Sequence, residues 1–177
     1  YMSCGVNIWL SSLIAIVIAL GIGALIGWLI AYFKTVPFII TLGMQGVARG
    51  LCYVLTSGSP IAITGDAVQT FRTIGGGNIC GIASFVIILA VLAIICQFLL
   101  RKTKYFAQVY FIGSNEKAAA FAGVDVMKTK IILYAISSFL ACMAGLLSLS
   151  RFGVATATLG SQAESRAITA AVIGGTA

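Results

Sequence analysis

Three polar side chains recur at helical spacing within an otherwise apolar run of this sequence. Thr41, Gln45 and Arg49 are four residues apart, so a helix places all three on one face. If that helix begins at Pro37, a rise of about 1.5 Å per residue puts Arg49 about 18 Å along it. A charge at that depth in lipid is costly unless it faces the bundle interior or a wet cavity. The stripe therefore predicts a polar solute pathway, a structural hydrogen-bond network between helices, or an arginine that snorkels to the headgroups.

A second polar stretch, GSNEKAAAFAGVDVMKTK at residues 113–130, lies between two segments that are apolar enough to span a membrane. Ser114 is a suitable N-cap, Glu116 suits the positive end of a helix, and Gly123 is suited to ending it. The helix would present one aromatic side chain, Phe121, on a smooth alanine surface. About two turns are too short to be stable alone in water. We expect the segment to pack under the protein's own helices or to fit a groove in a partner.

A third stretch, SQAESRAITAAVIGG at residues 161–175, combines a helix start with an apolar continuation. Ser161 and Glu164 have the spacing of a capping box, which predicts a helix running to about Ile173 before two glycines. A half-helix that enters the membrane directs its positive N-terminus at the entrance of a pathway. Two interpretations stay open: a re-entrant helix from residue 162, or an ordinary spanning helix cut off where the sequence ends.

The composition places these stretches in a membrane protein. Only 8% of the residues are charged and 60% are hydrophobic, whereas soluble domains carry about 25% charged residues. Four runs approach or exceed the roughly 20 residues needed to cross a hydrocarbon core of about 30 Å: residues 8–33, 37–55, 81–100 and 131–150. The predicted fold class is all-α, a polytopic transmembrane helical bundle. Because the sequence ends within an apolar stretch, we interpret residues 1–177 as a partial transmembrane domain.

Small residues predict where the helices touch, and glycine and proline predict where the chain turns. Three groups of small residues would give close helix contacts in lipid: Gly23 and Gly27, Gly46 and Gly50, and Ala141, Ala144 and Gly145. Ser, Gly and Pro in residues 56–80 predict turns and no helix there. Gly75, Gly76 and Gly77 are expected to form a flexible linker, because no Lys-Ser/Thr pair follows them as in a phosphate-binding loop.

The basic residues predict the orientation in the membrane. Seven fall on the side that holds Lys34 and the loop at residues 101–130: Lys34, Arg101, Lys102, Lys104, Lys117, Lys128 and Lys130. The other side keeps Arg72, Arg151 and Arg166. Because cytoplasmic loops carry an excess of Lys and Arg, residues 101–130 are expected in the cytoplasm. The net charge of +7 therefore reflects residues flanking the membrane segments and does not indicate a nucleic-acid partner.

Several function classes lack their residues in this sequence. Histidine is absent, and none of the four apolar runs contains Asp or Glu. The chain therefore offers neither a catalytic constellation nor a metal site, and we expect no enzyme activity and no cofactor of its own. An ion-driven secondary transporter or channel would usually need an acid inside the membrane. No phosphate-binding motif occurs, so any ATP that drives transport would bind to a partner subunit.

Four stretches carry a resemblance to a known family. They are VPFIITLGMQGVARGL at residues 36–51, IGSNEKAAAFAGVDVMKTKI at 112–131, LSRFGVATATLG at 149–160 and AITAAVIGGT at 167–176. In this order they resemble the membrane permease subunit of ribose-type sugar ABC importers, over nearly the whole chain. The sequence departs from that pattern at residues 166–169, where Arg-Ala-Ile-Thr stands in place of the common Asp-Ala-Ile-Ala.

The resemblance implies a fold, a function and a set of partners. It implies an α-helical permease in the bacterial inner membrane, with a second permease copy, a cytoplasmic ATPase subunit and an extracytoplasmic sugar-binding protein. The cargo would be a ribose-like pentose, a hexose or a polyol. The helix in residues 116–123 would be a short cytoplasmic coupling helix that the ATPase moves. Its coupling residues would be Glu116, Ala118, Ala119, Phe121 and Gly123.

Two other transport functions stay open beside the sugar importer. One is an ABC permease for branched-chain amino acids or nucleosides, whose membrane subunits share the architecture that the resemblance implies. The other is the ion-driven secondary transporter, which the missing intramembrane acids disfavour.

Overall fold

The computed structural model describes residues 7–63, 68–79 and 82–175, and most of these residues are helical. The helices are α1 (Ile8–Phe33), α2 (Pro37–Thr56), α3 (Val68–Gly76), α4 (Ser84–Lys102), α5 (Lys104–Ser114), α6 (Glu116–Phe121), α7 (Val126–Phe152) and α8 (Ala163–Ile173). Within these described ranges, four two-residue strands form two antiparallel ribbons: β1 (Ile61–Ala62) with β4 (Val154–Ala155), and β2 (Asn78–Ile79) with β3 (Ile82–Ala83). The prediction of an α-helical membrane protein is confirmed.

Three of these helices, α1, α2 and α7, are long and apolar enough to cross a membrane, and α4 contains a shorter apolar helix over Ser84–Leu99. The predicted run at residues 81–100 starts at Gly81, which lies outside the described residues. Helix α7 begins earlier than the predicted run at residues 131–150, because the Asp125 side chain accepts a hydrogen bond from the Lys128 N–H and caps it. The bilayer limits of the four runs stay predictions.

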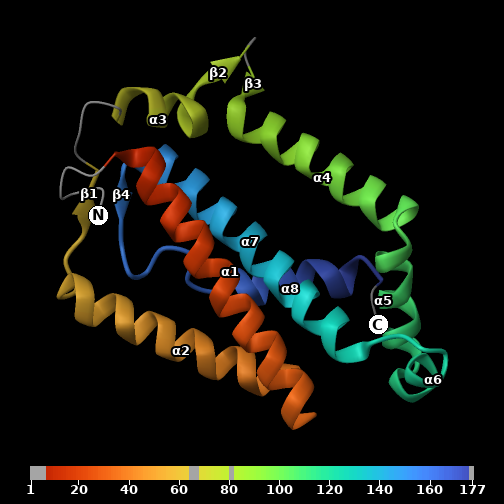
Figure 1. The fold of residues 1–177 in the computed structure, drawn as a ribbon. Helices are drawn as coiled ribbons and strands as arrows, with labels where there is room; N and C mark the ends of the chain where they lie inside the picture. The colour runs from red at the N-terminus through yellow and green to blue at the C-terminus, as the bar shows by residue number, and fades with distance from the viewer. Residues whose placement is uncertain (1–6, 64–67, 80–81, 176–177) are drawn as a thin grey trace.

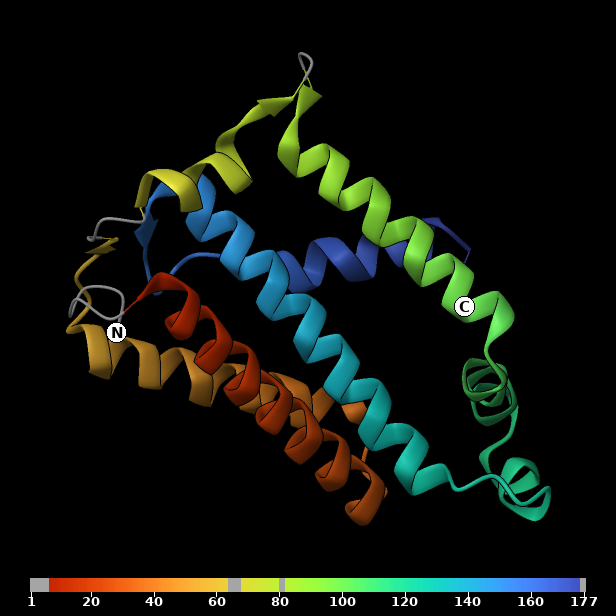
Figure 2. The same ribbon diagram turned by 45° about the horizontal axis from the view of Figure 1, so that its top comes forward.

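Helices α1 and α7 pack side by side along much of their length (Figures 1 and 2), in antiparallel directions. Gly23 and Gly27 lie at the contact. A Cβ atom on Gly27 would lie 2.7 Å from the Ile131 Cα, and one on Gly23 would lie 2.7 Å from the Tyr134 carbonyl oxygen. Glycine is required at both positions because only hydrogen fits between the two backbones. The first of the predicted small-residue contacts is therefore confirmed.

The other two small-residue groups make no comparable contact within the described part of the chain. A Cβ atom on Gly46, Gly50 or Gly145 would meet nothing within 4 Å there. Ala141 and Ala144 are exposed on α7. The small residues thus mark helix faces that another helix could approach closely. Of the three groups, the one at Gly23 and Gly27 makes such a contact within the described residues.

A turn forms at Ser57 and Gly58, as predicted for residues 56–80. The prediction of no helix and of a flexible linker is wrong, because the segment contains helix α3. The Gly75 N–H donates a 2.9 Å hydrogen bond to the Ser150 hydroxyl, which in turn donates to the Phe71 carbonyl. Ser150 is 1% exposed. A Cβ atom on Gly75 would lie 2.8 Å from the Leu147 carbonyl oxygen. Packing on α7 therefore overrides the poor helix propensity of glycine, and Gly75 serves as a contact residue.

The described helices end at two opposite ends of the bundle, and basic residues lie at both. Figure 1 shows α5 and α6 at the end where α1 finishes and α2 and α7 begin, while α3 and the β1–β4 ribbon lie at the opposite end. Lys34 and Lys117 line one hollow at the first end, and Arg72 lies beside Gly153 at the second. The predicted loop at residues 101–130 also contains α5, a helix that the sequence did not predict. Which end faces the cytoplasm stays a prediction.

The α1–α7 contact predicts opposite effects for two glycines of α1. Gly27→Ala inserts a methyl group against the α7 backbone, and overpacking of this kind costs about 1–3 kcal/mol. Gly21→Ala adds the same methyl group where nothing lies within 4 Å, and alanine favours a helix over glycine by up to about 1 kcal/mol. Unfolding of the full-length protein in detergent, followed by circular dichroism, should show a lower midpoint for Gly27→Ala only. Equal midpoints for both variants would contradict the observed packing.

Candidate functional site

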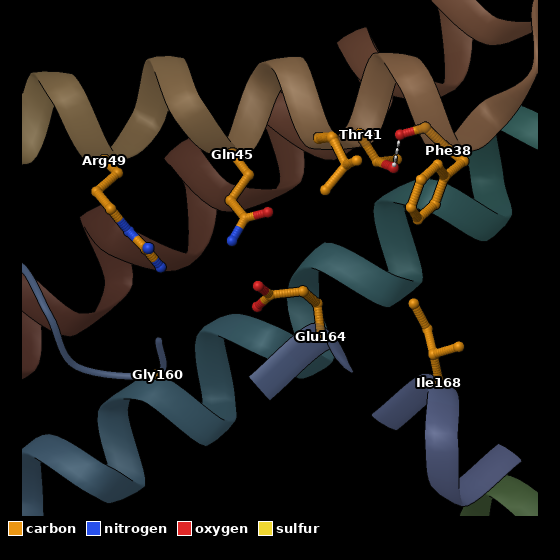
Figure 3. A pocket seen from close by; sticks show the side chains of 8 residues that line it. Phe38, Thr41, Gln45, Arg49, Gly160, Glu164 and Ile168 are labelled. Carbon is orange, nitrogen blue, oxygen red and sulfur yellow. Dashed lines mark hydrogen bonds between the residues drawn. The ribbon is translucent and has the colours of Figure 1, made fainter. Parts of the chain in front are cut away.

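The α2–α8 pocket is a hollow of about 340 Å³ between these two helices. Its lining residues are Phe38, Thr41, Leu42, Gln45 and Arg49 of α2, together with Gly160, Glu164 and Ile168. Figure 3 shows the predicted stripe of Thr41, Gln45 and Arg49 along the α2 face that borders the pocket. The volume lies in the range of small-molecule sites, about 300–1,000 Å³. The structure thus brings the three predicted pathway residues to one hollow, while their role in transport stays a prediction.

Glu164 is a charged residue of the pocket that was not predicted to belong to the pathway. Its carboxylate extends from α8 toward the Gln45 amide, with the Arg49 guanidinium further along α2 (Figure 3). Glu164 lies outside the three described helices that are long and apolar enough to cross a membrane. Its pKa is lowered from the ordinary value, first by a hydrogen bond from the Gln45 side chain and then by a backbone N–H. Desolvation opposes these two effects, and the charge of Arg49 adds a smaller lowering. The carboxylate is therefore ionised at neutral pH.

The capping box that was predicted at Ser161 does not form, which leaves Glu164 free to face α2. Helix α8 starts at Ala163, after Gln162 in the left-handed region (φ 64°) with no side-chain cap bond. The preceding turn is closed by backbone hydrogen bonds, from Ser161 N to Thr158 O and from Ala163 N to Gly160 O. The turn therefore replaces the side-chain cap. The chain has four Asp and Glu residues, so each acid is rare enough to indicate a possible site. The predicted capping box gave Glu164 a local role and therefore did not point to the pocket.

Helix α8 ends where the sequence predicted the helix of residues 161–175 to end. The helix ends at Ile173, and the Gly174 N–H donates to the Ala170 carbonyl. Its 11 residues extend about 16 Å, roughly half of a hydrocarbon core of about 30 Å. The re-entrant and spanning interpretations of this segment both stay predictions.

The polar groups of the α2–α8 pocket offer both donors and acceptors. The Thr41 hydroxyl donates to the Pro37 and Phe38 carbonyls at 3.1 Å each, so its oxygen is left to the pocket as an acceptor. Arg49 supplies donors, Glu164 supplies acceptors, and the Gln45 amide supplies both. The opposite charges of Arg49 and Glu164 make the pocket formally neutral. This chemistry fits a small polar solute with several hydroxyl groups, or one that carries both charges.

The short helix α6 forms at the predicted place but with a different N-cap. The Asn115 side chain accepts a 3.1 Å hydrogen bond from the Ala118 N–H, while Ser114 ends α5 and its hydroxyl donates to the Phe111 carbonyl. Asn115 fits because its extended backbone turns the chain between two helices. Gly123 ends the helical turn in the left-handed region (φ 83°), as predicted.

The predicted coupling residues of α6 fall into an inner and an outer set. Ala119 is 3% exposed and seats the helix on the protein, whereas Phe121 is 94% exposed and Ala118 is exposed beside it. Glu116 connects α6 to α7 through an ion pair in which both carboxylate oxygens lie 2.8 Å from the Lys130 Nζ. The described residues therefore leave the Phe121 side chain almost fully exposed, as expected for a side chain that docks into a partner.

The helices, the polar hollow between two of them and the projecting α6 define an α-helical membrane protein with the features of a transport subunit. The whole chain, residues 1–177, matches the family described as the permease component of the branched-chain amino acid transport system, and it belongs to that family. It is therefore a permease component and not an enzyme. The resemblance to importer permeases that the sequence predicted is confirmed.

Relatives of known name include permeases for three sugars. The chain is 36% identical to a fructose import permease protein of Bifidobacterium longum, over 99% of this chain and 50% of the relative. It is 39% identical to a ribose import permease protein of Bacillus subtilis, over 85% and 46%. It is 32% identical to a D-allose transport system permease protein of Escherichia coli, over 99% and 53%. The chain spans about half the length of these relatives, and no solved structure is a significant match.

The geometry of the α2–α8 pocket predicts a cross-link between α2 and α8. Full-length protein without native cysteines, carrying Gln45→Cys and Glu164→Cys, should be joined by a short bismaleimide because both positions line one hollow. A protease site introduced into the turn after α2 places the two cysteines on different fragments. After digestion, cross-linked protein keeps the two fragments joined and runs as one band. The matched control pairs Gln45→Cys with Arg166→Cys, an exposed α8 residue that does not line the pocket. Equal yields from both pairs would contradict the arrangement.

Proposed function

We propose that this chain is part of the permease subunit of an ABC importer and lines the membrane pathway of a monosaccharide. The cargo class is a ribose-like pentose, a hexose or a polyol. The observation that carries the proposal is the names of three relatives that match most of the chain: a fructose import permease, a ribose import permease and a D-allose transport system permease. The α2–α8 pocket supports it, because its mixed donors and acceptors suit a neutral polyhydroxy compound and Phe38, Leu42 and Ile168 suit the apolar faces of a sugar ring.

A branched-chain amino acid is the second candidate cargo, because the family description names such a transport system. The charges of Arg49 and Glu164 would also fit the carboxylate and ammonium groups of a zwitterion. The pocket charges alone therefore do not separate the two cargo classes, and the names of the relatives favour the sugar. A competition experiment with both classes distinguishes them directly.

The proposed assembly contains a cytoplasmic ATPase subunit that binds ATP, an extracytoplasmic sugar-binding protein and a second permease copy, all at a bacterial inner membrane. The permease is multi-pass, and residues 101–130 face the cytoplasm. In this assembly α6 is the coupling helix, with Phe121 as its anchor in the ATPase. The near-complete exposure of Phe121 supports this role, because the side chain is free to enter a groove of a partner.

Replacing Phe121 should uncouple the motor from the pathway. Phe121→Asp puts a charge where an apolar groove is expected, so stimulation of ATP hydrolysis by loaded binding protein should fall close to the basal rate. The permease should still insert and fold, because Phe121 is not covered by the rest of the described chain. The measurement is ATPase activity of the complete complex in proteoliposomes.

The matched control for this variant is Phe111→Asp, which makes the same change at an exposed phenylalanine of α5. The control should retain most of the stimulation. Unchanged stimulation with Phe121→Asp, or an equal loss with Phe111→Asp, would remove Phe121 from the coupling mechanism.

Replacing Arg49 tests the pathway and the cargo in one uptake assay. Arg49→Leu removes the donors that face Gln45 and Glu164, and a lost hydrogen bond to a charged group corresponds to about ten-fold or more in affinity. Uptake of labelled ribose, fructose or allose by the complete complex should fall by about that factor, while the amount of inserted protein changes little.

Arg49→Lys keeps the charge and should retain part of the uptake, which separates a pathway role from a structural one. Equal losses of uptake and inserted protein with Arg49→Leu would make Arg49 structural. Accumulation of labelled leucine and of no sugar would overturn the proposed cargo class. Sugar uptake that continues with an inactivated ATPase would overturn the ABC mechanism.

A further inference from the structure

A larger hollow lies at the opposite end of α2 from Arg49, where α6 meets the bundle. We call it the basal hollow, and its volume is about 700 Å³. Its lining residues are Ala31, Lys34, Thr35, Pro37, Ile112, Glu116, Lys117, Ala120, Val126, Met127 and Lys130. These residues come from the end of α1, the turn to α2, and helices α5, α6 and α7. Neither the proposed cargo pathway nor the docking of Phe121 uses this hollow.

The level of the basal hollow in the membrane follows from the helix ends around it. Helix α1 ends at Phe33, α2 begins at Pro37 and α7 begins at Val126, and these are the three helices long enough to cross a membrane. Figures 1 and 2 show these three ends on the same side of the structure, beside α6. The ends of spanning helices lie where hydrocarbon gives way to water. The hollow therefore lies at the level of the lipid headgroups.

The charge of the basal hollow is positive. Three lysines line it against one carboxylate, and that carboxylate, Glu116, is already paired with Lys130, whose side chain is only 19% exposed. Lys34 and Lys117 are exposed and form no ion pair with any described residue. Two ammonium groups from different segments thus face one hollow without a counter-charge, which is the arrangement that attracts an anion such as a phosphate group.

Apart from Thr35, the remaining lining of the hollow is apolar, and this narrows the class of anion. Ala31, Pro37, Ile112, Val126 and Met127 contribute most of that wall. A free phosphate ion gains nothing from an apolar wall, and a neutral sugar gains little from unpaired lysines. A phospholipid offers both parts at this level, a phosphate for the lysines and glycerol and acyl carbons for the wall. We propose that the basal hollow binds the headgroup of an anionic phospholipid.

The backbone positions the two lysines from two different segments that line the hollow. Lys34 has a left-handed conformation (φ 49°) in the short turn between α1 and α2, a conformation that favours glycine. Lys117 lies in the first turn of α6, which the Glu116–Lys130 ion pair connects to α7. A phosphate shared by Lys34 and Lys117 would connect α6 to the α1–α2 turn. The bound lipid would thus brace α6 against two spanning helices.

The test measures the retention of phosphatidylglycerol by the purified full-length permease, with native mass spectrometry for stoichiometry and a titration for affinity. Lys34→Gly suits the left-handed backbone and Lys117→Ala suits an exposed helix position, so both variants are expected to fold. A lysine near the surface changes the affinity for an anionic lipid by about five-fold. Each variant should weaken binding by about that factor, and the double variant by about thirty-fold.

Lys128→Ala is the matched control, because Lys128 lies in the first turn of α7, is 80% exposed and does not line the hollow. It should leave the retention of phosphatidylglycerol almost unchanged, whereas an equal loss would show only diffuse surface attraction and overturn the proposal. Phosphatidylcholine should not be retained, and millimolar inorganic phosphate should not displace phosphatidylglycerol. Equal retention of both lipids would overturn the proposal, and displacement by phosphate would overturn it in favour of a free-anion site.

Discussion

The close contact of α1 with α7 at Gly23 and Gly27 is the constraint on which the rest of the described structure depends. In lipid, apolar side chains gain little by leaving their surroundings, so helices associate through van der Waals packing and hydrogen bonds. Two backbones approach closely only where no side chain separates them, and the two glycines supply that approach against Ile131 and Tyr134. The contact holds α7 against α1 and makes α7 the element to which other parts attach.

In the described part of the chain, each end of α7 carries a side-chain attachment to another helix. At one end, buried Ser150 holds α3 through Gly75 and Phe71. At the other end, Lys130 holds α6 through Glu116. The first link is buried, so breaking it would leave unsatisfied polar groups, whereas the second is partly exposed and contributes less. A firm connection at one end and a weaker one at the other agree with the proposed coupling role of α6, in which the helix would transmit movement without being fixed in one position.

The proposed cargo site is built from elements that are less firmly packed than α1 and α7. Neither α2 nor α8 has a buried residue among those described, and their facing surfaces carry Arg49, Gln45 and Glu164. Elements with little buried surface cost little to displace. Opposite charges on two such helices attract strongly when water is excluded and weakly when it enters. A site of this kind suits a pathway that must open alternately to the two sides of a membrane.

Features that depend on nearby residues could be predicted from the sequence alone. Apolar runs predicted the spanning helices, periodicity predicted the shared face of Thr41, Gln45 and Arg49, and glycine positions predicted where α6 and α8 end. These features depend on residues within a few turns of one another. Three features could not be predicted from local sequence: helix α3, the cap at Asn115 and the approach of Glu164 to Arg49. Helix α3 depends on Ser150 of α7, which is distant in the chain, and the approach of Glu164 depends on the placement of α8 beside α2. The cap at Asn115 depends on where α5 ends, because Ser114 is the last residue of that helix. Because local propensities are weak beside tertiary packing, the arrangement in space determines that Gly75 contacts Ser150 and that Glu164 faces the pocket.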